Sequence, residues 1–347
     1  STLTSTLTQF AERHPDLPGA LLRNYEAVAG LIEDADRLTQ EQRLLIGAYF
    51  THEYAIEAAA LSNPSIVRAP DQTGLGDGEQ RFVLSLRAIG EGHLSSIEFR
   101  SGVIDTSGHI TLDEPSRFTT IGERREPLYH RDSFDAKLRE LGARNEIAGL
   151  VLDPLPAQFT LAQLEAAIAD LNEHGVDRVV AYETTRIIHW IAASNYTIEF
   201  APESRISERV IFPSGPAESQ GMEDARFVRF GHDDGTVLYY AIYTAFDGFQ
   251  ILPQLIETAD FRIFRIATLN GEAARNKGMA LFPRLIDGRF AALSRQDNES
   301  NFLVFSDDVR HWDEPIRIQQ PEQPWELMQL GNCGSPLETD AGWLVVT

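Results

Sequence analysis

The feature that most constrains the fold is a series of short apolar segments in the second half of the chain. These segments are 227–230, 237–243, 261–268, 279–285, 290–293, 302–305 and 343–346. Turn sequences such as Asp233-Asp234-Gly235, Asp287-Gly288 and Asp340-Ala341-Gly342 separate them. Many short strands with this punctuation predict a sandwich, a barrel or a propeller, and no clean internal repeat decides among the three.

The N-terminal part of the chain has a helical pattern instead. Thr39 and Gln42 form a capping-box pattern, which predicts a helix over 43–61 that ends at Asn63-Pro64. Alternating apolar residues then predict strands at 81–87 and 93–104, followed by a turn at 105–108. We therefore expect residues 1–60 to form an N-terminal helical segment and 61–118 to form the first part of a β domain.

A second helical block interrupts the β pattern. Thr160 and Gln163 offer another capping box, 166–171 is strongly helical, and Gly175 is expected to cap the helix at its C-terminus. Residues 119–195 are thus predicted to be a helical insertion, and 196–347 the remainder of the β domain. The last apolar segment reaches Thr347 without a turn or a polar tail, so we expect the chain to be truncated within its last strands.

Composition argues against several classes of function. The 30 basic and 52 acidic residues give a formal net charge of −22, which disfavours binding to nucleic acids and to anionic membranes. No apolar stretch approaches the roughly 18 residues of a membrane span, and the N-terminal residues lack the pattern of a signal peptide. Cys333 is the only cysteine, which excludes an internal disulfide and fits a reducing compartment. We therefore expect a cytoplasmic protein.

The densest polar cluster is Gly221-Met222-Glu223-Asp224-Ala225-Arg226, directly before the strand that begins at Phe227. Because adjacent side chains of a strand face opposite sides, we expect Glu223 and Asp224 to have different roles, and Asp224 and Arg226 to share a face. A carboxylate beside a guanidinium is commonly only an ion pair. The functional alternative is a carboxylic acid that donates a proton to a departing oxygen at the mouth of a β scaffold.

This cluster and several other motifs resemble glycoside hydrolase family 130, which contains β-mannoside phosphorylases and β-mannosidases. In family order, the motifs are those at 63–66, 84–87, 221–226, 243–248, 276–283, 294–295 and 342–344. The resemblance covers 61–118 and 196–347 and implies an all-β five-bladed β-propeller, to which the α-helical segments are additions. The family usually has proline where this chain has Ala225.

The resemblance also implies roles for particular residues. Asp224 matches the family's proton donor, which is thought to act through a hydroxyl of the bound mannosyl unit. The residues implied around that unit are Asn63, Arg87, Glu223, Arg226 and Asp247. Ordinary roles stay open for three of them, since Asn63 before proline and Asp247 before glycine suit turns, and Arg87 suits the surface of a strand.

Members of the family use either phosphate or water as the second reactant. A phosphate dianion needs convergent cations, whereas water needs a carboxylate base. Lys277 and Arg295 match two basic phosphate-binding positions of the phosphorolytic members. Gln329 stands at a third position where lysine is common, and a histidine ligand of the family would come directly after Thr347.

We therefore expect inverting phosphorolysis of β-manno-oligosaccharides to α-mannose 1-phosphate, with inorganic phosphate as co-substrate and no cofactor or metal. The histidines His52, His93, His189 and His232 have no paired metal-ligand spacing. Hydrolysis with Asp297 or Glu299 as the base is one alternative. A non-catalytic carbohydrate-binding propeller is a second, and a protein whose helical blocks at 1–60 and 120–195 form a homo-oligomer is a third.

Overall fold

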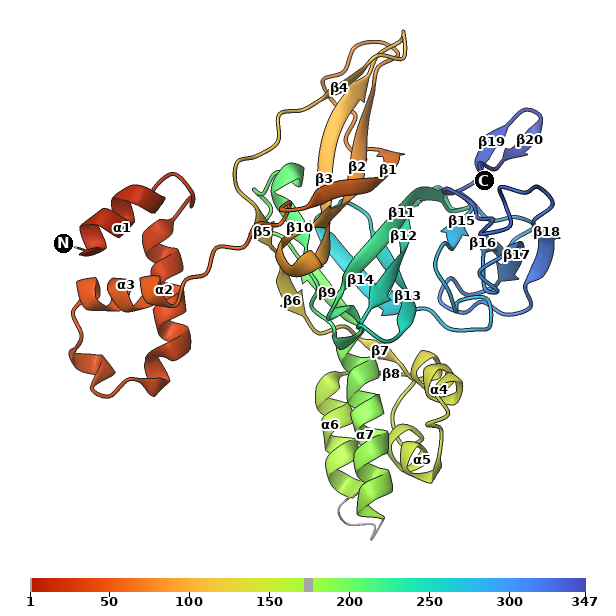
Figure 1. The fold of residues 1–347 in the computed structure, drawn as a ribbon. Helices are drawn as coiled ribbons and strands as arrows, with labels where there is room; N and C mark the ends of the chain where they lie inside the picture. The colour runs from red at the N-terminus through yellow and green to blue at the C-terminus, as the bar shows by residue number, and fades with distance from the viewer. Residues whose placement is uncertain (1, 172–176) are drawn as a thin grey trace.

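The computed structural model describes residues 2–171 and 177–347 of the chain. Figure 1 shows a β-rich body, a small N-terminal helical unit joined to it by an extended linker, and a second helical unit that extends from the body. Among the described residues, no helix is both long and apolar enough to cross a membrane. The described part of the chain is therefore a mixed fold, rich in β-structure, with helices outside the sheets.

The N-terminal unit consists of α1 (Thr2–Phe10), α2 (Leu17–Val28) and α3 (Gln40–Tyr49), with short 3₁₀ turns at Ala29–Leu31 and Ala35–Arg37. Its helices pack around a small apolar core of Leu3, Leu17, Leu21 and Leu44. The predicted capping box is confirmed, because Gln42 N donates to Thr39 Oγ1 (3.2 Å) and Thr39 N donates to Gln42 Oε1 (2.9 Å).

The predicted continuation of this helix to Leu61 is wrong, because α3 ends at Tyr49. The following segment forms the linker, which hydrogen-bonds to the body. Ala59 N donates to Ile89 O (2.8 Å), and the Tyr54 hydroxyl donates to Glu91 O (2.9 Å). These tertiary hydrogen bonds compete with the helical propensity of the alanine-rich sequence and keep it extended.

The first sheet is formed mainly by residues before the helical insertion. Its strands are β1 (Ala60–Arg68), β2 (Gln80–Ile89), β3 (Ser95–Ile104), β4 (Ile110–Leu112), β5 (Thr120–Ile121) and β10 (Arg209–Ile211). The order is β1-β2-β3-β10-β5, with β4 paired to β3. The predicted strands at 81–87 and 93–104 are confirmed in β2 and β3, and the turn after β3 is closed by Gly108 N donating to Asp105 O (3.0 Å).

The second sheet carries the polar cluster. Its order is β11 (Gly221–Gly231), β12 (Val237–Phe246), β13 (Ile251–Thr258), β14 (Ile263–Thr268), β9 (Tyr196–Glu199) and β6 (Glu123–Arg125). The apolar segments did not predict β13, because Pro253 interrupts it and proline lacks the N–H that a central strand uses. Pro253 nevertheless pairs in register with Thr244, and its carbonyl accepts from Leu269 N (3.3 Å).

A third sheet and a hairpin follow among the described residues. The sheet contains β15 (Ala280–Leu281), β16 (Phe290–Ser294), β17 (Asn301–Ser306) and β18 (Ile316–Gln319), and the hairpin β19 (Leu337–Thr339) and β20 (Gly342–Leu344). Figure 1 shows the hairpin apart from the sheet, close to the C-terminal end of the chain.

The second helical unit contains α4 (Arg131–Glu140), α5 (Glu146–Leu152), α6 (Leu161–Asp170) and α7 (Arg178–Ala193), with the short strands β7 (Tyr129–His130) and β8 (Gln158–Phe159). Phe134, Leu138 and Ile188 lie in its buried core. The capping box of Thr160 and Gln163 is confirmed, whereas Gly175 lies outside the described residues. The residues just before this unit form β5, which pairs with β10 in the first sheet, and β6, which pairs with β9 in the second sheet.

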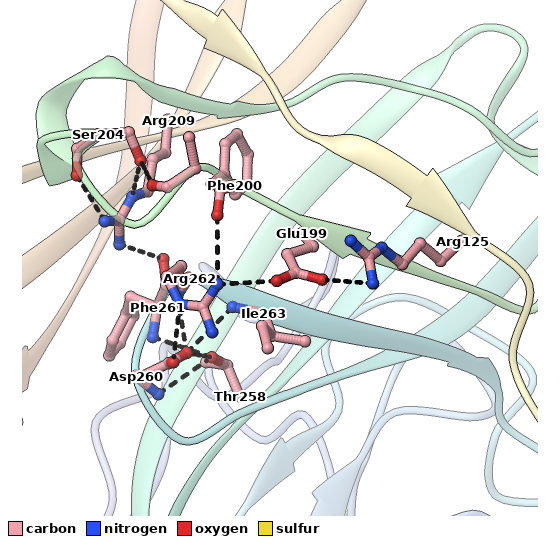
Figure 2. Close-up of polar contacts among 11 residues, drawn as sticks. Arg125, Glu199, Phe200, Ser204, Arg209, Thr258, Asp260, Phe261, Arg262 and Ile263 are labelled. Carbon is pink, nitrogen blue, oxygen red and sulfur yellow. Dashed lines mark hydrogen bonds and ion pairs between the residues drawn. The ribbon is translucent and has the colours of Figure 1, made fainter.

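The first two sheets share one buried apolar core. Phe99 of the first sheet stacks on Phe264 of the second, with ring centroids 5.4 Å apart, and makes an edge contact with Phe227 at 5.9 Å. Figure 2 shows a polar network that also links these sheets. Arg209 donates to Phe261 O (2.8 Å), while Glu199 accepts from Arg262 (2.9 Å) and pairs with Arg125 (3.0 Å).

The buried carboxyl of Glu98 lies at the contact between the linker and the first sheet, and its titration makes the stability of the protein depend on pH. The side chain of Glu98 is 2% exposed, and Arg100 pairs with both Glu98 (3.0 Å) and Glu57 of the linker. Burial raises the pKa of Glu98 from its ordinary 4.5 to about 7, and the Glu57 carboxylate also raises it. Since the folded state holds this proton more tightly than the unfolded state, Glu98 lowers the free energy of unfolding as the pH rises from 4.5 to about 7.

We therefore expect wild type to lose stability relative to Glu98→Gln across this pH window. The measurement is urea unfolding of both proteins at several pH values between about 5 and about 7. The exposed substitution Glu203→Gln is the matched control and should follow wild type. Parallel curves for wild type and Glu98→Gln would show that Glu98 does not titrate in this range.

Candidate active site

Two β-bulges face each other at the polar cluster. The β1–β2 register shifts between Ser62 and Ser65, and the β11–β12 register shifts between Glu223 and Arg226. Asn63 (φ 50°) and Asp224 (φ 56°) occupy these bulges in the left-handed conformation, which asparagine and aspartate adopt more readily than most residues. The Asn63 side-chain amide donates to Asp224 Oδ1 across the gap between the strands.

The bulge changes where the two adjacent carboxylates point. Arg87 of β2 donates to Glu223 Oε1 (2.7 Å), and its other terminal nitrogen lies 3.4 Å from Asp224 Oδ1. The expectation that Glu223 and Asp224 face opposite sides is therefore wrong, because the extra residue of the bulge breaks the strict alternation of the strand. Both carboxylates lie against one guanidinium.

The accessibility of the two carboxylates differs. The side chain of Glu223 is 12% exposed, and it accepts from Arg87 and also pairs with Lys277 Nζ. The side chain of Asp224 is 33% exposed, and its contacts with Asn63 and Arg87 both go to Oδ1. Within the described residues Oδ2 of Asp224 has no hydrogen-bond partner. Asp224 is therefore the carboxylate that is free to meet a ligand.

Arg226 and Arg295 lie close to Asp224. Arg226 donates to the carbonyl oxygens of Gly278 (2.8 Å) and Asn332 (2.9 Å), which fixes the loops that carry them. Burial lowers the pKa of the Arg226 guanidinium and the charge of Arg295 lowers it further, whereas the Asp224 carboxylate opposes both effects. Burial also lowers the pKa of Arg295, again opposed by Asp224. The negative charge of Asp224 is thus felt by both arginines.

Arg295 depends on two glycines for its position. A Cβ at Gly331 would lie 2.2 Å from one terminal nitrogen of Arg295, and a Cβ at Gly278 would lie 3.4 Å from the other. With its amide oxygen turned toward this arginine, Gln329 accepts from both terminal nitrogens (2.5 and 2.9 Å). The residue at the third basic position of the family therefore contacts Arg295. Gly331, Asn332 and the Gln329 contact were not predicted, because a glycine and a backbone carbonyl leave no motif.

Lys277 and Arg295 do not make a direct contact among the described residues. Lys277 turns toward Glu223, while Arg295 lies along Gly278, the residue that follows Lys277. Their convergence on one anion therefore stays a prediction.

Three predicted candidates make no contact with this cluster in the part of the chain that the structure describes. Asp247 Oδ1 accepts from Phe249 N (2.8 Å) and Gln250 N (2.7 Å), as a turn residue does. Asp297 Oδ1 accepts from Glu299 N (2.9 Å) within its own loop, and Glu299 is exposed. Hydrogen bonds within their own turns account for the positions of the Asp247 and Asp297 side chains.

A cavity of about 700 Å³ borders the cluster. Asn63, Asp224 and Arg226 lie on one wall, and residues 333–338 on another. Ser65 fixes the wall between β1 and β11, because its Oγ accepts from Phe227 N (2.9 Å). A free carboxylate oxygen therefore lies beside a cavity of the size that ligand sites have, roughly 300–1,000 Å³.

Comparison with known proteins gives relatives of one kind. The chain is 30% identical over 153 residues to the 1,2-beta-oligomannan phosphorylase of Thermoanaerobacter sp., a match that covers 41% of this chain and 47% of the relative. It is 23% identical over 270 residues to the beta-1,2-mannobiose phosphorylase of Listeria innocua, covering 76% and 70% of the two chains. The chain thus matches about half the length of the first relative.

Comparison with solved structures and with family models gives weaker similarity than the comparison with these relatives. A structure from the GH130 family of mannoside phosphorylases, which contains hydrolases of beta-1,2 mannosidic linkages in Candida mannan, is 12% identical with a TM-score of 0.39. That alignment covers 82% of this chain and 59% of the other. No family model matches the chain.

The names of the two relatives are those of phosphorylases that act on β-linked mannosides. The chain is thus similar to mannoside phosphorylases, the kind of enzyme that its motifs resemble.

Proposed function

We propose that this chain carries the catalytic residues of an inverting β-mannoside phosphorylase. The observation that carries the proposal is the arrangement of Asp224, whose Oδ2 is free beside a cavity, within a cluster that also contains Lys277 and Arg295. One side of such a site supplies a proton, and the other supplies positive charge for an anionic reactant.

In the proposed reaction, a proton passes from Asp224 through a hydroxyl of the mannosyl unit to the departing glycosidic oxygen. An oxygen of hydrogenphosphate attacks the anomeric carbon from the opposite face, and the glycosidic C–O bond breaks as the new C–O bond forms. The products are α-mannose 1-phosphate and a shortened sugar. In the overall balance, the proton of hydrogenphosphate replaces the one that the leaving sugar takes, so no metal or cofactor is required.

The residues proposed around the mannosyl unit are Asn63, Arg87, Glu223, Arg226 and Asp247. The contacts of Asn63 and Arg87 with Asp224 support the first two. Glu223 is proposed to hold Arg87 and Lys277 in place, and Arg226 to fix the loops at 278 and 332. For Asp247, support comes only from the family motif.

The positions of the candidate phosphate-binding residues and of the candidate bases favour phosphate over water as the second reactant. Lys277 and Arg295 lie in or beside the cluster. The candidate bases Asp297 and Glu299 lie in the turn that begins at Arg295, but both are exposed, and Asp297 Oδ1 accepts from backbone N–H groups of that turn. Phosphate would have to draw Lys277 away from Glu223, an exchange that a dianion can drive because its charge exceeds that of the carboxylate. Hydrolysis is the second candidate, since the family includes hydrolases.

We further propose that the sheets are blades of a five-bladed propeller, divided at 61–118 and 196–347, with helical additions at 1–60 and 119–195. The sheets built from β1–β3, β11–β14 and β15–β18 support this, since each is antiparallel along those strands. A cytoplasmic location is proposed from the single free thiol at Cys333. The exposed Tyr49 and Phe50 of the N-terminal unit are compatible with a homo-oligomer.

The test of this function is cleavage of β-mannobioses with and without inorganic phosphate. Two relatives are named for β-1,2-linked substrates and a third, 31% identical over 93 residues, for β-1,4-linked ones, so the β-1,2 and β-1,4 disaccharides are tested first, with the β-1,3 isomer beside them. A rate that depends on phosphate supports the proposal. Binding of the sugar without cleavage under any condition would indicate a carbohydrate-binding protein instead.

Gly331→Ala tests the role of Arg295 without removing a charge. The new Cβ would displace the end of a flexible side chain, so the fold should be retained while the guanidinium moves. We expect the KM for phosphate to rise about fivefold, the result of weakening one charged hydrogen bond by ~1 kcal/mol. Gly30→Ala, in the exposed 3₁₀ turn of the N-terminal unit, where a Cβ meets nothing within 4 Å, is the control. An equal KM in wild type and Gly331→Ala would exclude Arg295 from phosphate binding.

A further inference from the structure

A second cavity of about 310 Å³ lies between the second helical unit and the second sheet. It is lined by Phe134 and Lys137 of α4, by Ile191 of α7, by Ile266 of β14 and by Asn270, which follows β14. It shares no lining residue with the cavity beside Asp224. The cavity is therefore separate from the proposed active site.

The wall of this cavity contains a buried acceptor with no partner. Asn270 is 2% exposed, and its side-chain Oδ1 has no hydrogen-bond partner within residues 2–171 and 177–347. An unsatisfied buried polar atom costs about 1–3 kcal/mol, so such atoms are rare in native proteins unless a ligand or water meets them. Asn270 thus points to a donor group that enters the cavity.

A buried cation lies in the same wall. Lys137 is 3% exposed, its pKa is lowered by burial, and its ammonium group pairs with Glu140. An ammonium has three N–H donors, and the contact with Glu140 uses one of them. Lys137 can therefore donate to a molecule in the cavity while it keeps its counter-ion.

The polar groups are held in place by the surrounding backbone. Glu140 also accepts from Gly271 N, which ties α4 to the residue next to Asn270. Asn270 N donates to Arg310 O (2.8 Å), and Asn270 O accepts from Trp312 N (2.8 Å). The position of Asn270 is thus fixed by α4 and by the segment 310–312, as a preformed ligand site requires.

The chemistry of the lining selects a neutral ligand with hydroxyl groups. The carboxylate of Glu257 lies against both arginines of the lining, Arg265 (2.9 Å) and Arg310 (3.8 Å), and Lys137 pairs with Glu140, so each of these charges already has a counter-ion. A hydroxyl can donate to Asn270 Oδ1 and accept from Lys137, which a fully deprotonated anion or an ammonium group cannot do together. Phe134, Ile191 and Ile266 provide apolar contacts for C–H groups. The volume lies at the lower end of the range for ligand sites, about 300 Å³, and suits one sugar ring.

We propose that this cavity is a second binding site for a monosaccharide-sized polyhydroxylated molecule. The ligand bridges α4 and the end of β14, so its binding stabilises the contact between the helical unit and the sheet. The site uses no residue of the cluster around Asp224, and the inference does not depend on the reaction proposed there.

The test is isothermal titration calorimetry of the full chain with mannose, glucose and myo-inositol as separate probes. Asn270→Leu removes the acceptor at nearly constant volume and should weaken binding at this site by at least about tenfold. Ser133→Phe is a second variant, because Ser133 lines the cavity from the partly exposed side of α4 and a phenyl ring would fill it. Circular dichroism and the melting temperature show whether each variant folds.

Arg87→Ala separates this site from the proposed active site. We expect one probe at least to bind to Arg87→Ala as it does to wild type, and to lose affinity in Asn270→Leu and Ser133→Phe. Binding that disappears in Arg87→Ala but persists in folded Ser133→Phe would place the sugar at Asp224 only and would overturn the proposal. Absence of binding by all three probes would overturn it as well.

Discussion

Asp224→Asn is expected to lower kcat for β-mannobiose cleavage by about 10²–10⁴, the range for removal of a general acid. The asparagine amide has no proton that it can give to a leaving oxygen. The fold should be retained, because Asn occupies a left-handed bulge as readily as Asp and can still accept from Asn63. The measurement is kcat at saturating phosphate, together with the melting temperature.

Asp233→Asn is the matched control, since Asp233 is exposed in the turn between β11 and β12. It should have the kcat of wild type. If folded Asp224→Asn retained more than about a tenth of wild-type turnover, Asp224 would not be the proton donor. The adjacent Glu223 would then be the next carboxylate to test, although two cations already hold it.

Lys277→Ala is expected to raise the KM for phosphate by about 10- to 100-fold, because one hydrogen bond to a charged group contributes about 1.5–3 kcal/mol. The KM for the mannoside should change much less, since the proposed role of Lys277 is to hold and orient the anion. The measurement is the initial rate over a matrix of phosphate and mannobiose concentrations.

Two variants make this result specific. Lys277→Arg keeps a cation and should retain part of the phosphate affinity. Arg289→Ala removes an exposed arginine elsewhere and should have the same KM for phosphate and for the mannoside as wild type. Because Lys277 also pairs with Glu223, a purely structural role would raise both KM values together. Equal increases for phosphate and mannoside would contradict the role in phosphate binding.

Local sequence signals predicted local structure well. Both capping boxes were confirmed, because a threonine and a glutamine at this spacing satisfy each other's backbone groups without help from the rest of the fold. The strands β2 and β3 followed from the alternation of apolar residues. The end of α3 and the strand β13 were missed, since tertiary hydrogen bonds override helical propensity at Ala59 and strand pairing tolerates Pro253.

The candidate site shows a similar division. Motifs pointed to Asn63, Arg87 and Asp224, and the structure brings these three side chains into contact. The orientation of Glu223 was not predictable, because it depends on a bulge that the pattern of side chains does not encode. The hydrogen bonds from Arg226 to the carbonyl oxygens of Gly278 and Asn332 could not be predicted from the sequence either, because any residue can supply a backbone oxygen.

The central claim is that the cluster around Asp224 transfers a mannosyl unit to phosphate with inversion, and the identity of the first product tests it most directly. β-1,2-Mannobiose is incubated with the full chain and inorganic phosphate, and proton and phosphorus NMR spectra are recorded from the earliest times. The account predicts α-mannose 1-phosphate in amounts equal to the mannose released from the other end. Free mannose alone, formed at the same rate with and without phosphate, would contradict it.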